Sequence, residues 1–596
     1  MRCSRRLPRK LFKNFLFFQW IGIVLIFALS LANGCRKSES EHTKQEAKSK
    51  TTEAAFAPIV QSQVTESTKP ETRFSLEDRT ETLGVSFAYH NGEEASLYSI
   101  VESLGGGVAL FDFDGDGRID IFATGGGEFH SDHKSSGLPN GLFRNFGDRF
   151  ENVASYALIE TPQHYTHGVS IGDFNNDGFR DVLTTGYGGL ELFQNMGDGS
   201  FESVTANSGL QADGCTTSAA WGDFNSDSNL DLYIVRYVNW SFDNNPICKS
   251  SLNGERDICP PSTFEPVSHL LFLGDGQGGF RDVTRSNGLR SDGKGLGVVG
   301  ADVDNDGDMD LYVANDTTDN FLYLNDGQGR FEEAGILHGV ARDDRGLPNG
   351  SMGVAAYDYD ENGFIDLWVA NYERESYGLY QNQGSGQFLH MSRRTGVTAL
   401  GGAFVGFGTE IVDLDFDGKP EILCTNGHVI KFPSAAPRQQ LPLLISYDGN
   451  RFIRQNFELS HYFSTAHEGR GLAVGDLDNN GTQDVVITHL NQPLSILLNE
   501  TPSENRAVRI RLIGTQSSRD AFGARLVYKL NEQEHMRQVV AGGSYLSSSD
   551  RDIWIAIPKE NSDVSLTVFW PKGNSQKWKT APGETDITII EPSIDR

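Results

Sequence analysis

The amino-acid sequence predicts an all-β protein, in which a seven-bladed β-propeller is followed by a small C-terminal β-sandwich-like domain. Two repeated patterns carry this prediction. A nine-residue acidic loop, D-x-[DN]-x-[DN]-[GS]-x-x-[DE], occurs seven times and starts at Asp112, Asp173, Asp223, Asp302, Asp358, Asp413 and Asp476. A second turn pattern, such as LYLNDGQGRF at 322–331, follows most of these loops. Repeats spaced about 50 to 80 residues apart are typical of propellers and solenoids, whose units bury their faces against one another.

Strand-like segments flank each acidic loop. GVALF precedes Asp112, and similar β-branched or aromatic runs such as LYVA and VVIT follow the loops. Such runs indicate strands rather than helices, so each loop is predicted to be the turn of a β-hairpin. Two hairpins per repeat give about four strands, and seven such units that close in a ring protect their sheet edges.

The loop chemistry predicts Ca²⁺, with up to seven ions. Side-chain oxygens recur at positions 1, 3, 5 and 9, and position 7 can add a backbone carbonyl, which suits a hard cation that takes six to eight oxygen ligands. Position 6 is Gly in six loops, because a chain that wraps an ion needs positive φ there. The third loop has Ser228 instead, which predicts a weaker site.

The candidate metal ligands share these five loop positions. They are Asp112, Asp114, Asp116, Arg118, Asp120; Asp173, Asn175, Asp177, Phe179, Asp181; Asp223, Asn225, Asp227, Asn229, Asp231; Asp302, Asp304, Asp306, Asp308, Asp310; Asp358, Asp360, Asn362, Phe364, Asp366; Asp413, Asp415, Asp417, Lys419, Glu421; and Asp476, Asp478, Asn480, Thr482, Asp484.

Two other interpretations of the loops are weaker. An EF-hand needs a Glu at position 12 and flanking helices, and no loop here has a carboxylate at that position. Metal-free acidic turns remain the alternative, since Asp, Asn and Gly dominate turns in general. Seven copies with carboxylates at the same offsets favour the ion.

Residues 1–34 predict an export signal of the lipoprotein type. Six positive charges precede an apolar run, and Leu31 to Cys35 resembles a bacterial lipoprotein box, which implies lipidation of Cys35. An uncleaved membrane anchor and ordinary cleavage are the alternatives, and all three place the remaining chain outside the cytoplasm. Residues 35–72 are polar and are expected to form a flexible tether. We therefore expect a secreted protein or a lipoprotein of the bacterial cell envelope.

Charge and cysteine content restrict the partners. The formal net charge of −29 argues against nucleic acid and anionic lipid, so we expect membrane contact only through the N-terminal lipid or signal anchor. We expect a monomer that binds an extracellular protein or glycan. Cys248 and Cys259 bracket a short polar insert and are predicted to form a disulfide in an oxidising compartment.

The sequence also resembles known families. GVALFDFDGDGRIDIF and LYLNDGQGRF resemble FG-GAP or VCBS repeats of the kind found in integrin α-chain heads, which implies a propeller over residues 73–503. VSFAYHNG and SLGGGVALFDFDGDG resemble the start of the cartilage acidic protein group. Residues 504–596 resemble an ASPIC/UnbV domain, through residues that include Gly542, Gly543 and Tyr545, although IWIAIP at 553–558 departs from that pattern.

The predicted function is that of a cell-surface binding, adhesion or scaffolding module in which the ions are structural. The alternative is a secreted or periplasmic enzyme that uses the central channel. His164, His167, His428 and His489 are its candidate residues, but each is expected to be a hydrogen-bonded core or turn histidine. We identify no catalytic constellation, because the sequence has no GxSxG, HExxH or P-loop motif in a suitable context.

Overall fold

The computed structural model describes residues 72–400, 402–559 and 563–593. The predicted export signal, Cys35 and all but the last residue of the predicted tether therefore lie outside the described residues. Within the described ranges, no helix is long and apolar enough to cross a membrane. The described residues belong to one compact unit.

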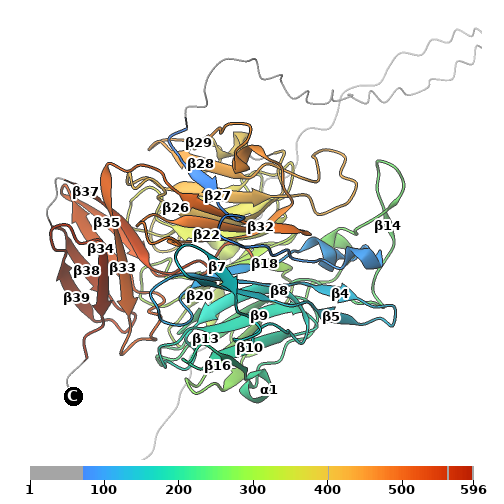
Figure 1. The fold of residues 1–596 in the computed structure, drawn as a ribbon, viewed down its shortest axis with the longest axis horizontal. Helices are drawn as coiled ribbons and strands as arrows, with labels where there is room; N and C mark the ends of the chain where they lie inside the picture. Colours follow the sequence, from blue (N-terminus) through green and yellow to red (C-terminus); the bar gives the residue numbers. More distant parts are fainter. Residues whose placement is uncertain (1–71, 401, 560–562, 594–596) are drawn as a thin grey trace, which may run out of the picture. The chain divides into compact units, whose positions relative to one another are not determined.

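Seven antiparallel sheets, six of four strands and one of five, make up most of the described chain (Figure 1). Their strands are β2 (Val108–Phe111), β3 (Asp120–Ala123), β6 (Gly141–Asn145), β7 (Phe150–Asn152); β8 (Tyr165–Gly172), β9 (Asp181–Tyr187), β10 (Leu190–Asn195), β11 (Phe201–Ser203); β12 (Thr216–Gly222), β13 (Asp231–Arg236), β16 (Leu270–Gly274), β17 (Phe280–Asp282); β18 (Gly295–Ala301), β19 (Asp310–Asn315), β20 (Phe321–Asn325), β21 (Phe331–Glu333); β22 (Ser351–Tyr357), β23 (Asp366–Asn371), β24 (Gly378–Asn382), β25 (Phe388–His390); β26 (Gly406–Val412), β27 (Glu421–Asn426), β28 (Leu443–Tyr447), β29 (Phe452–Arg454); and β30 (Gly469–Gly475), β31 (Asp484–His489), β32 (Gln492–Asn499), β1 (Leu76–Asp78).

The sheets are arranged in a ring. The first strand of each sheet contacts the first strand of the next, from β2 through β8, β12, β18, β22 and β26 to β30, and β30 contacts β2. The N-terminal strand β1 pairs with β32, so residues from both ends of the ring share one sheet. The predicted all-β, propeller-type fold is confirmed, and we interpret the seven sheets as its blades.

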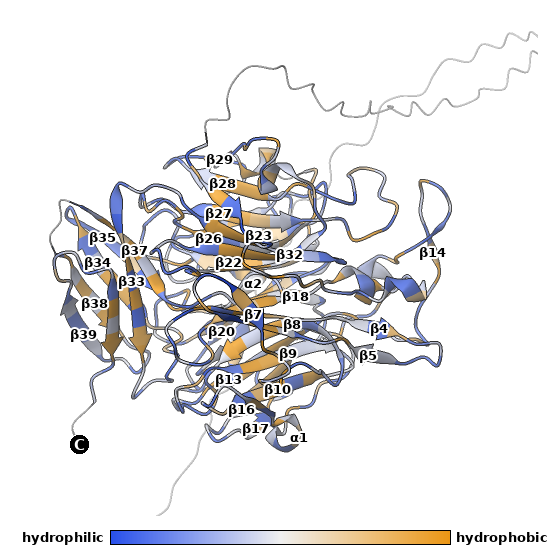
Figure 2. Cartoon of the chain, in the orientation of Figure 1, coloured by the Kyte–Doolittle hydropathy of each residue, from blue (hydrophilic) through white to orange (hydrophobic). Residues whose placement is uncertain are grey.

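Most inner strands of the ring are buried along their whole length. Every residue of β8, β12, β18 and β30 is buried, since these strands contact neighbouring sheets on both faces. Figure 2 shows hydrophobic residues recurring along the strands of the sheets, for example along β9 and β26. Trp221 on β12 and Trp368 on β23 are fully buried packing residues, as their strand positions predict.

The C-terminal residues form two further sheets. One contains β33 (Asn505–Ile513), β37 (Ile553–Pro558) and β40 (Asp586–Ile590); the other contains β34 (Arg525–Leu530), β35 (Gln533–Gln538), β38 (Ser565–Phe569) and β39 (Ser575–Lys579). Their apolar residues, such as Ile510 and Leu526, belong to the same hydrophobic cluster as Leu232 and Val298 of the propeller. The segment IWIAIP forms strand β37, so its departure from the expected pattern does not interrupt the sheet.

Small elements complete the described fold. The hairpin of β4 (Gly127–Phe129) and β5 (Ser135–Gly137) and the pair β14 (Cys248–Lys249) and β15 (Arg256–Asp257) extend from the propeller on the side away from the C-terminal strands (Figure 1). The two α-helices of the described chain are single turns, α1 (Thr205–Ser208) and α2 (Gly335–His338).

A loop from the C-terminal domain fills the middle of the ring. We call residues 541–550 the channel loop; it begins with β36 (Ala541–Gly542), which adds a fifth strand beside β18. The channel loop hydrogen-bonds to the first strand of every sheet, through Val108, Val169, Ser218, Val298, Val354, Thr409 and Leu472. Tyr545 and Leu546 are fully buried there.

Candidate functional site

The seven acidic loops all join the first strand of a sheet to the second. In the first sheet, Phe111 pairs with Asp120, so residues 112–119 form the hairpin turn, and the other six sheets repeat this register. The predicted hairpin turns are therefore confirmed. Because the first strands are neighbours around the ring, the loops lie at one rim of the propeller. We call it the loop rim.

The loop backbone folds around the first carboxylate. In the first loop, Asp112 Oδ1 accepts the N–H groups of Gly115 and Asp116, and Oδ2 accepts that of Gly117. Asp302 repeats this arrangement with the N–H groups of Asp306 and Gly307. These bonds turn the chain so that later side chains point back toward position 1.

Two backbone positions per loop are left-handed. The glycines at position 6 have positive φ, as predicted, for example 86° at Gly117. No atom would lie within 4 Å of a Cβ added at five of them, and at Gly178 the nearest atoms belong to the flexible side chain of Arg519. The conformation, not space, therefore selects glycine. Position 4 is also left-handed in every loop, including Phe416 with φ of 51°, which the sequence pattern did not reveal.

Ser228 shows why one loop departs from glycine. Its φ of 79° is strained for a residue with a Cβ, but its Oγ donates a hydrogen bond of 2.6 Å to the carbonyl oxygen of Gln516 in the C-terminal domain. The hydroxyl thus offsets a local strain with a contact between domains.

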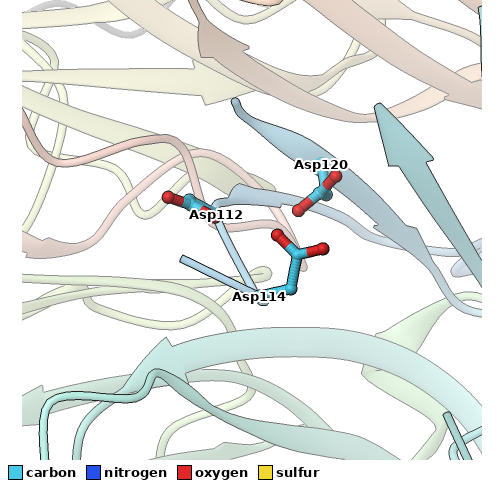
Figure 3. A group of neighbouring side chains, drawn as sticks. All are labelled: Asp112, Asp114 and Asp120. Carbon is cyan, nitrogen blue, oxygen red and sulfur yellow. The ribbon is translucent and has the colours of Figure 1, made fainter. Parts of the chain in front are cut away.

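Carboxylates converge in five of the loops within the described residues. In each, three acidic side chains bring oxygens within 4.8 Å of one another, as Asp112, Asp114 and Asp120 do in Figure 3. The groups are Asp112, Asp114, Asp120; Asp302, Asp304, Asp306; Asp358, Asp360, Asp366; Asp413, Asp415, Glu421; and Asp476, Asp478, Asp484. The second and third loops carry Asn175 and Asn225 at position 3, where the five loops with such groups carry Asp.

These groups fit a Ca²⁺ ion, which prefers oxygen ligands and accepts several carboxylates. In the loops with Arg118, Phe179, Phe364 or Lys419 at position 7, this position could contribute only its backbone carbonyl, since these side chains have no oxygen. Asp308, Asn229 and Thr482 have a side-chain oxygen at the same position. The N–H of each position 7 residue donates to the side chain at position 5, as Arg118 does to Asp116. This bond orients position 5 within the loop.

The acid at position 9 is the most buried group of each loop. Asp120 Oδ2 accepts the N–H of Phe113 and Oδ1 accepts that of Asn145, so it joins the loop to the third strand. Burial raises the pKa of Asp120 to about 8 and that of Asp181 to about 9. A bound cation would supply the positive charge that keeps such carboxylates ionised.

Five asparagines, each at the end of the third strand of its sheet, were not identified from the sequence. Their side-chain amides each donate to a carbonyl in the loop of the preceding sheet; they are Asn145, Asn195, Asn325, Asn382 and Asn499. Asn325, for example, donates to Phe224 O at 2.9 Å and to Met309 O in its own sheet at 3.1 Å. For four of them the signal is present in the sequence as repeated L-[FY]-x-N segments that end in the Asn, whereas Asn499 ends the segment ILLN.

Protein cations already contact some of the loops. Arg144 Nη2 lies 2.6 Å from Asp114 Oδ2, and Arg73 forms ion pairs with Asp415, Asp417 and Glu421. The sixth loop is therefore partly neutralised by the segment that precedes β1. We expect the loops to differ in ion affinity for this reason as well as for their acid content.

The C-terminal domain covers the loop rim. Asp173 N donates to Asp520 Oδ2 at 2.7 Å, Asp302 N donates to Gln538 Oε1 at 3.2 Å, and His535 Nδ1 lies 2.9 Å from Glu361 Oε1. The third and sixth loops contact the same domain through Ser228 and through Asn505, which donates to the carbonyl of Phe416. The acidic loops are therefore part of an interface within the chain.

The histidines considered for catalysis lie apart from the carboxylate groups. Burial lowers the pKa of His164 and of His489 to about 4, and His489 hydrogen-bonds to Tyr462 and to the carbonyl of Pro493. His167 contacts Tyr89 Oη and the carbonyl of Gly105. His428 Nδ1 accepts the N–H of Ile430. In the described residues, none of the four joins a group of three metal-ligating side chains.

Family comparisons match the regions with this geometry. The FG-GAP-like repeat matches residues 112–184, 173–234, 302–369 and 358–424, and the domain described as ASPIC and UnbV matches residues 514–595. The chain is an FG-GAP repeat protein that ends in an ASPIC and UnbV domain. We refer to the C-terminal domain by that name below.

Relatives of this FG-GAP protein include cartilage acidic protein 1. The human protein is 23% identical over 500 residues, which cover 81% of this chain and 62% of the relative. The Xenopus tropicalis protein is 23% identical over 510 residues, which cover 81% of this chain and 73% of the relative. The chain thus spans less than two thirds of the human relative's length.

Two solved lectins show distant similarity. A structure of an Agrocybe aegerita lectin that recognises non-reducing terminal N-acetylglucosamine covers 65% of this chain and 87% of its own, with a TM-score of 0.37 and 14% identity. The match to the BP39L lectin from Burkholderia pseudomallei covers 66% of this chain and 96% of the lectin, with a TM-score of 0.39 and 11% identity. At these values the likeness supports no inference about ligands.

Proposed function

We propose that this chain is an exported, calcium-binding propeller that serves as a binding or scaffolding module at the bacterial cell envelope. A lipid on Cys35 would anchor it, and the chain acts as a monomer toward an extracellular protein or glycan. The FG-GAP repeats and the similarity to cartilage acidic protein 1 support an extracellular binding module. The acidic groups support the ion.

One observation carries the structural role of the ions in this proposal: the loop rim is covered by the ASPIC and UnbV domain. An ion in such a loop would stiffen a hairpin that the domain contacts, and a partner would meet other surfaces. Extracellular modules bind Ca²⁺ with Kd values of about 10⁻⁴ to 10⁻³ M. We expect the acidic loops to bind Ca²⁺ with Kd values in that range, and calorimetry on the full exported chain would measure them.

Chelation tests this part of the proposal. EDTA should lower the melting temperature markedly, because uncompensated carboxylates in the loops repel one another and metal binding is coupled to folding. Differential scanning calorimetry in Ca²⁺ and in EDTA measures the difference. Mg²⁺ added to the EDTA-treated protein after dialysis is the matched control, since a smaller ion with stricter octahedral demands should restore less stability. Melting temperatures within a degree of each other in Ca²⁺ and EDTA would show that the loops are only turns.

Localisation and ligand need separate tests. Cys35→Ser should move the protein from the membrane fraction to the soluble fraction if the cysteine is lipidated. Capture of a defined surface protein or polysaccharide in Ca²⁺, with loss in EDTA, would support the binding role. Turnover of a small molecule that is lost in a His164 or His428 variant with native Ca²⁺ affinity would instead support the enzyme.

The alternative of an enzyme in the central channel has less support. The channel loop occupies the middle of the ring and contacts all seven first strands. The remaining cavity there, of about 160 Å³, is lined by charged groups that include Arg180, Glu410 and Asp550. This volume is below the range of about 300 to 1,000 Å³ that is typical of ligand pockets.

A further inference from the structure

A second, larger cavity lies at the rim of the propeller opposite the acidic loops. It has a volume of about 370 Å³ and lies between the starts of several first strands and the insert closed by the Cys248–Cys259 disulfide. Ligand cavities of this size are typical for small molecules. None of the acidic loops contributes to its lining.

The floor of the cavity is apolar and rigid. Leu296, Met352 and Phe407 form it, each near the start of a first strand and each no more than 3% exposed. Tyr545 of the channel loop supports this floor, because its ring meets Phe407 edge to face at 5.0 Å. The floor can therefore hold an apolar or aromatic body without rearrangement.

Hydrogen bonds fix the position of the roof of the cavity. Asp257 in the disulfide insert is buried, and its carboxylate accepts the N–H groups of Lys431 and Phe432 at 2.8 and 3.1 Å. The insert is thereby tied to a segment from a distant part of the chain. Ile258 and Phe432 add apolar surface to the lining.

One wall carries two carboxylates that form no ion pair within the described residues, although Lys249 also lines the cavity. Asp316 Oδ2 accepts the hydroxyl of Tyr237 at 2.5 Å, and Glu375 Oε2 accepts the N–H of Gly350 at 2.8 Å. The nearby cations are engaged elsewhere, since Lys294 Nζ donates to the carbonyl of Pro261 and Arg345 pairs with Asp343. Within the described residues, neither carboxylate has an ion-pair partner.

The electrostatics of this wall favour a positive ligand. Burial raises the pKa of Asp316 to about 6, and burial together with the charge of Asp316 raises the pKa of Glu375 to about 7. A cation placed between two such groups gains from both, because the surroundings have a low dielectric constant. A neutral group of the same shape would gain only a hydrogen bond.

We propose that this cavity binds a small amphipathic amine, with its apolar or aromatic body against Leu296, Met352 and Phe407 and its ammonium group at Asp316 and Glu375. This site is independent of the calcium loops and goes beyond the binding of a protein or glycan. The chemistry identifies the class of ligand, an alkyl or aryl amine.

Calorimetry with three probes of similar shape tests the proposal on the full chain in Ca²⁺ buffer. The probes are phenethylamine, 2-phenylethanol and 3-phenylpropionate. We expect phenethylamine to bind about tenfold or more tightly than 2-phenylethanol and the anion not to bind. The double variant Asp316→Asn, Glu375→Gln should lose about tenfold in affinity for the amine and keep that for the alcohol.

Asp344→Asn is the matched control, because Asp344 is an exposed acid on a neighbouring segment that does not line the cavity. It should leave the binding of all three probes unchanged. Equal affinities for the amine and the alcohol would overturn the proposal, as would no amine binding at about 10 mM by a protein with its native melting temperature. Tighter binding of a lysine-containing tetrapeptide than of phenethylamine would also overturn it and assign the cavity to peptides.

Discussion

At the scale of single residues, side-chain amides join neighbouring blades. Each of the five asparagines donates from one sheet to the carbonyl of the position 2 residue in the acidic loop of the preceding sheet. The third sheet has Gly274 at the corresponding place, where its N–H still donates to Asp231. The ring is thus held by polar contacts between blades as well as by apolar packing.

Removing one of these amides should be costly. Asn325→Ala leaves the carbonyls of Phe224 and Met309 without their side-chain donor, and each unsatisfied buried acceptor costs about 1 to 3 kcal/mol. We expect a loss of about 2 kcal/mol or more, measured as a lower melting temperature in Ca²⁺. Asn450→Ala, in an exposed turn, is the control and should have little effect. Equal melting temperatures of the two variants would contradict the role of the amide.

Glu410 predicts a dependence of stability on pH. Ser549 of the channel loop donates to Glu410 at 2.6 Å, and burial raises the pKa of Glu410 from 4.5 to about 7. Because the folded state binds this proton more tightly than the unfolded state, its contribution to stability is complete below pH 4.5 and is lost as the pH rises through about 7.

Glu410→Gln should remove this dependence. At pH 8 the variant should have a higher melting temperature than the native protein, with a free energy of unfolding that is larger by up to about 3 kcal/mol. Near pH 4.5 the two proteins should melt at similar temperatures. Melting curves between these pH values at constant Ca²⁺ measure the difference. If the native and variant curves stay parallel across the range, the carboxylate is not the responsible group.

At the scale of structural elements, the acidic loops are unequal. The fourth loop combines a three-acid group with Gly307, whereas the third loop has Asn225, Ser228 and no such group in the described chain. The third loop is instead tied to the ASPIC and UnbV domain through Ser228 and through Lys572, whose Nζ lies 3.8 Å from Asp223. The fourth loop thus has the residues that suit an ion, whereas the third loop has more contacts with the ASPIC and UnbV domain.

Paired substitutions should separate these roles. Asp302→Asn, Asp306→Asn should lower the melting temperature in Ca²⁺ more than Asp223→Asn, Asp227→Asn. Each pair removes two carboxylates, but the fourth loop has the fuller acid set and a Gly at position 6, so more ion binding is lost there. The gap should close in EDTA, where ion binding no longer contributes. Equal losses in Ca²⁺ would refute the ranking of the two loops.

At the scale of the whole molecule, the channel loop couples the two domains. Four of its residues have positive φ, namely Gly542, Gly543, Ser544 and Leu546. A Cβ at Gly542 would lie 2.6 Å from the carbonyl oxygen of Val298, so glycine is required there by both conformation and space. The motif residues of the ASPIC and UnbV domain therefore serve the propeller rather than their own sheets.

Tyr545 tests this coupling. Its ring is fully buried, and its hydroxyl donates to the carbonyl of Leu104 at 3.1 Å. Tyr545→Ala should destabilise the protein by about 3 to 5 kcal/mol, as expected for loss of a large buried aromatic side chain. Tyr545→Phe keeps the ring and should lose only about 1 kcal/mol. Chemical denaturation with both variants checks this, and similar losses would show that the ring contributes little.

The sequence by itself determined the repeats, their hairpin turns and the positive φ at position 6. These features are local: each depends on the residues of one loop and on the strands beside it, so period and turn chemistry were sufficient. The same holds for the oxygen-rich chemistry that indicates Ca²⁺, since five of the loops bring three acids together as their spacing implies.

Only the tertiary structure decided how distant segments meet. The pairing of β1 with β32, the asparagine contacts between blades and the channel loop in the ring all join residues tens to hundreds of positions apart. A one-dimensional pattern does not specify such contacts, because many packings satisfy the same local preferences. The cavity below the disulfide insert has the same origin, since Asp316, Glu375 and Phe407 come together only when the ring closes.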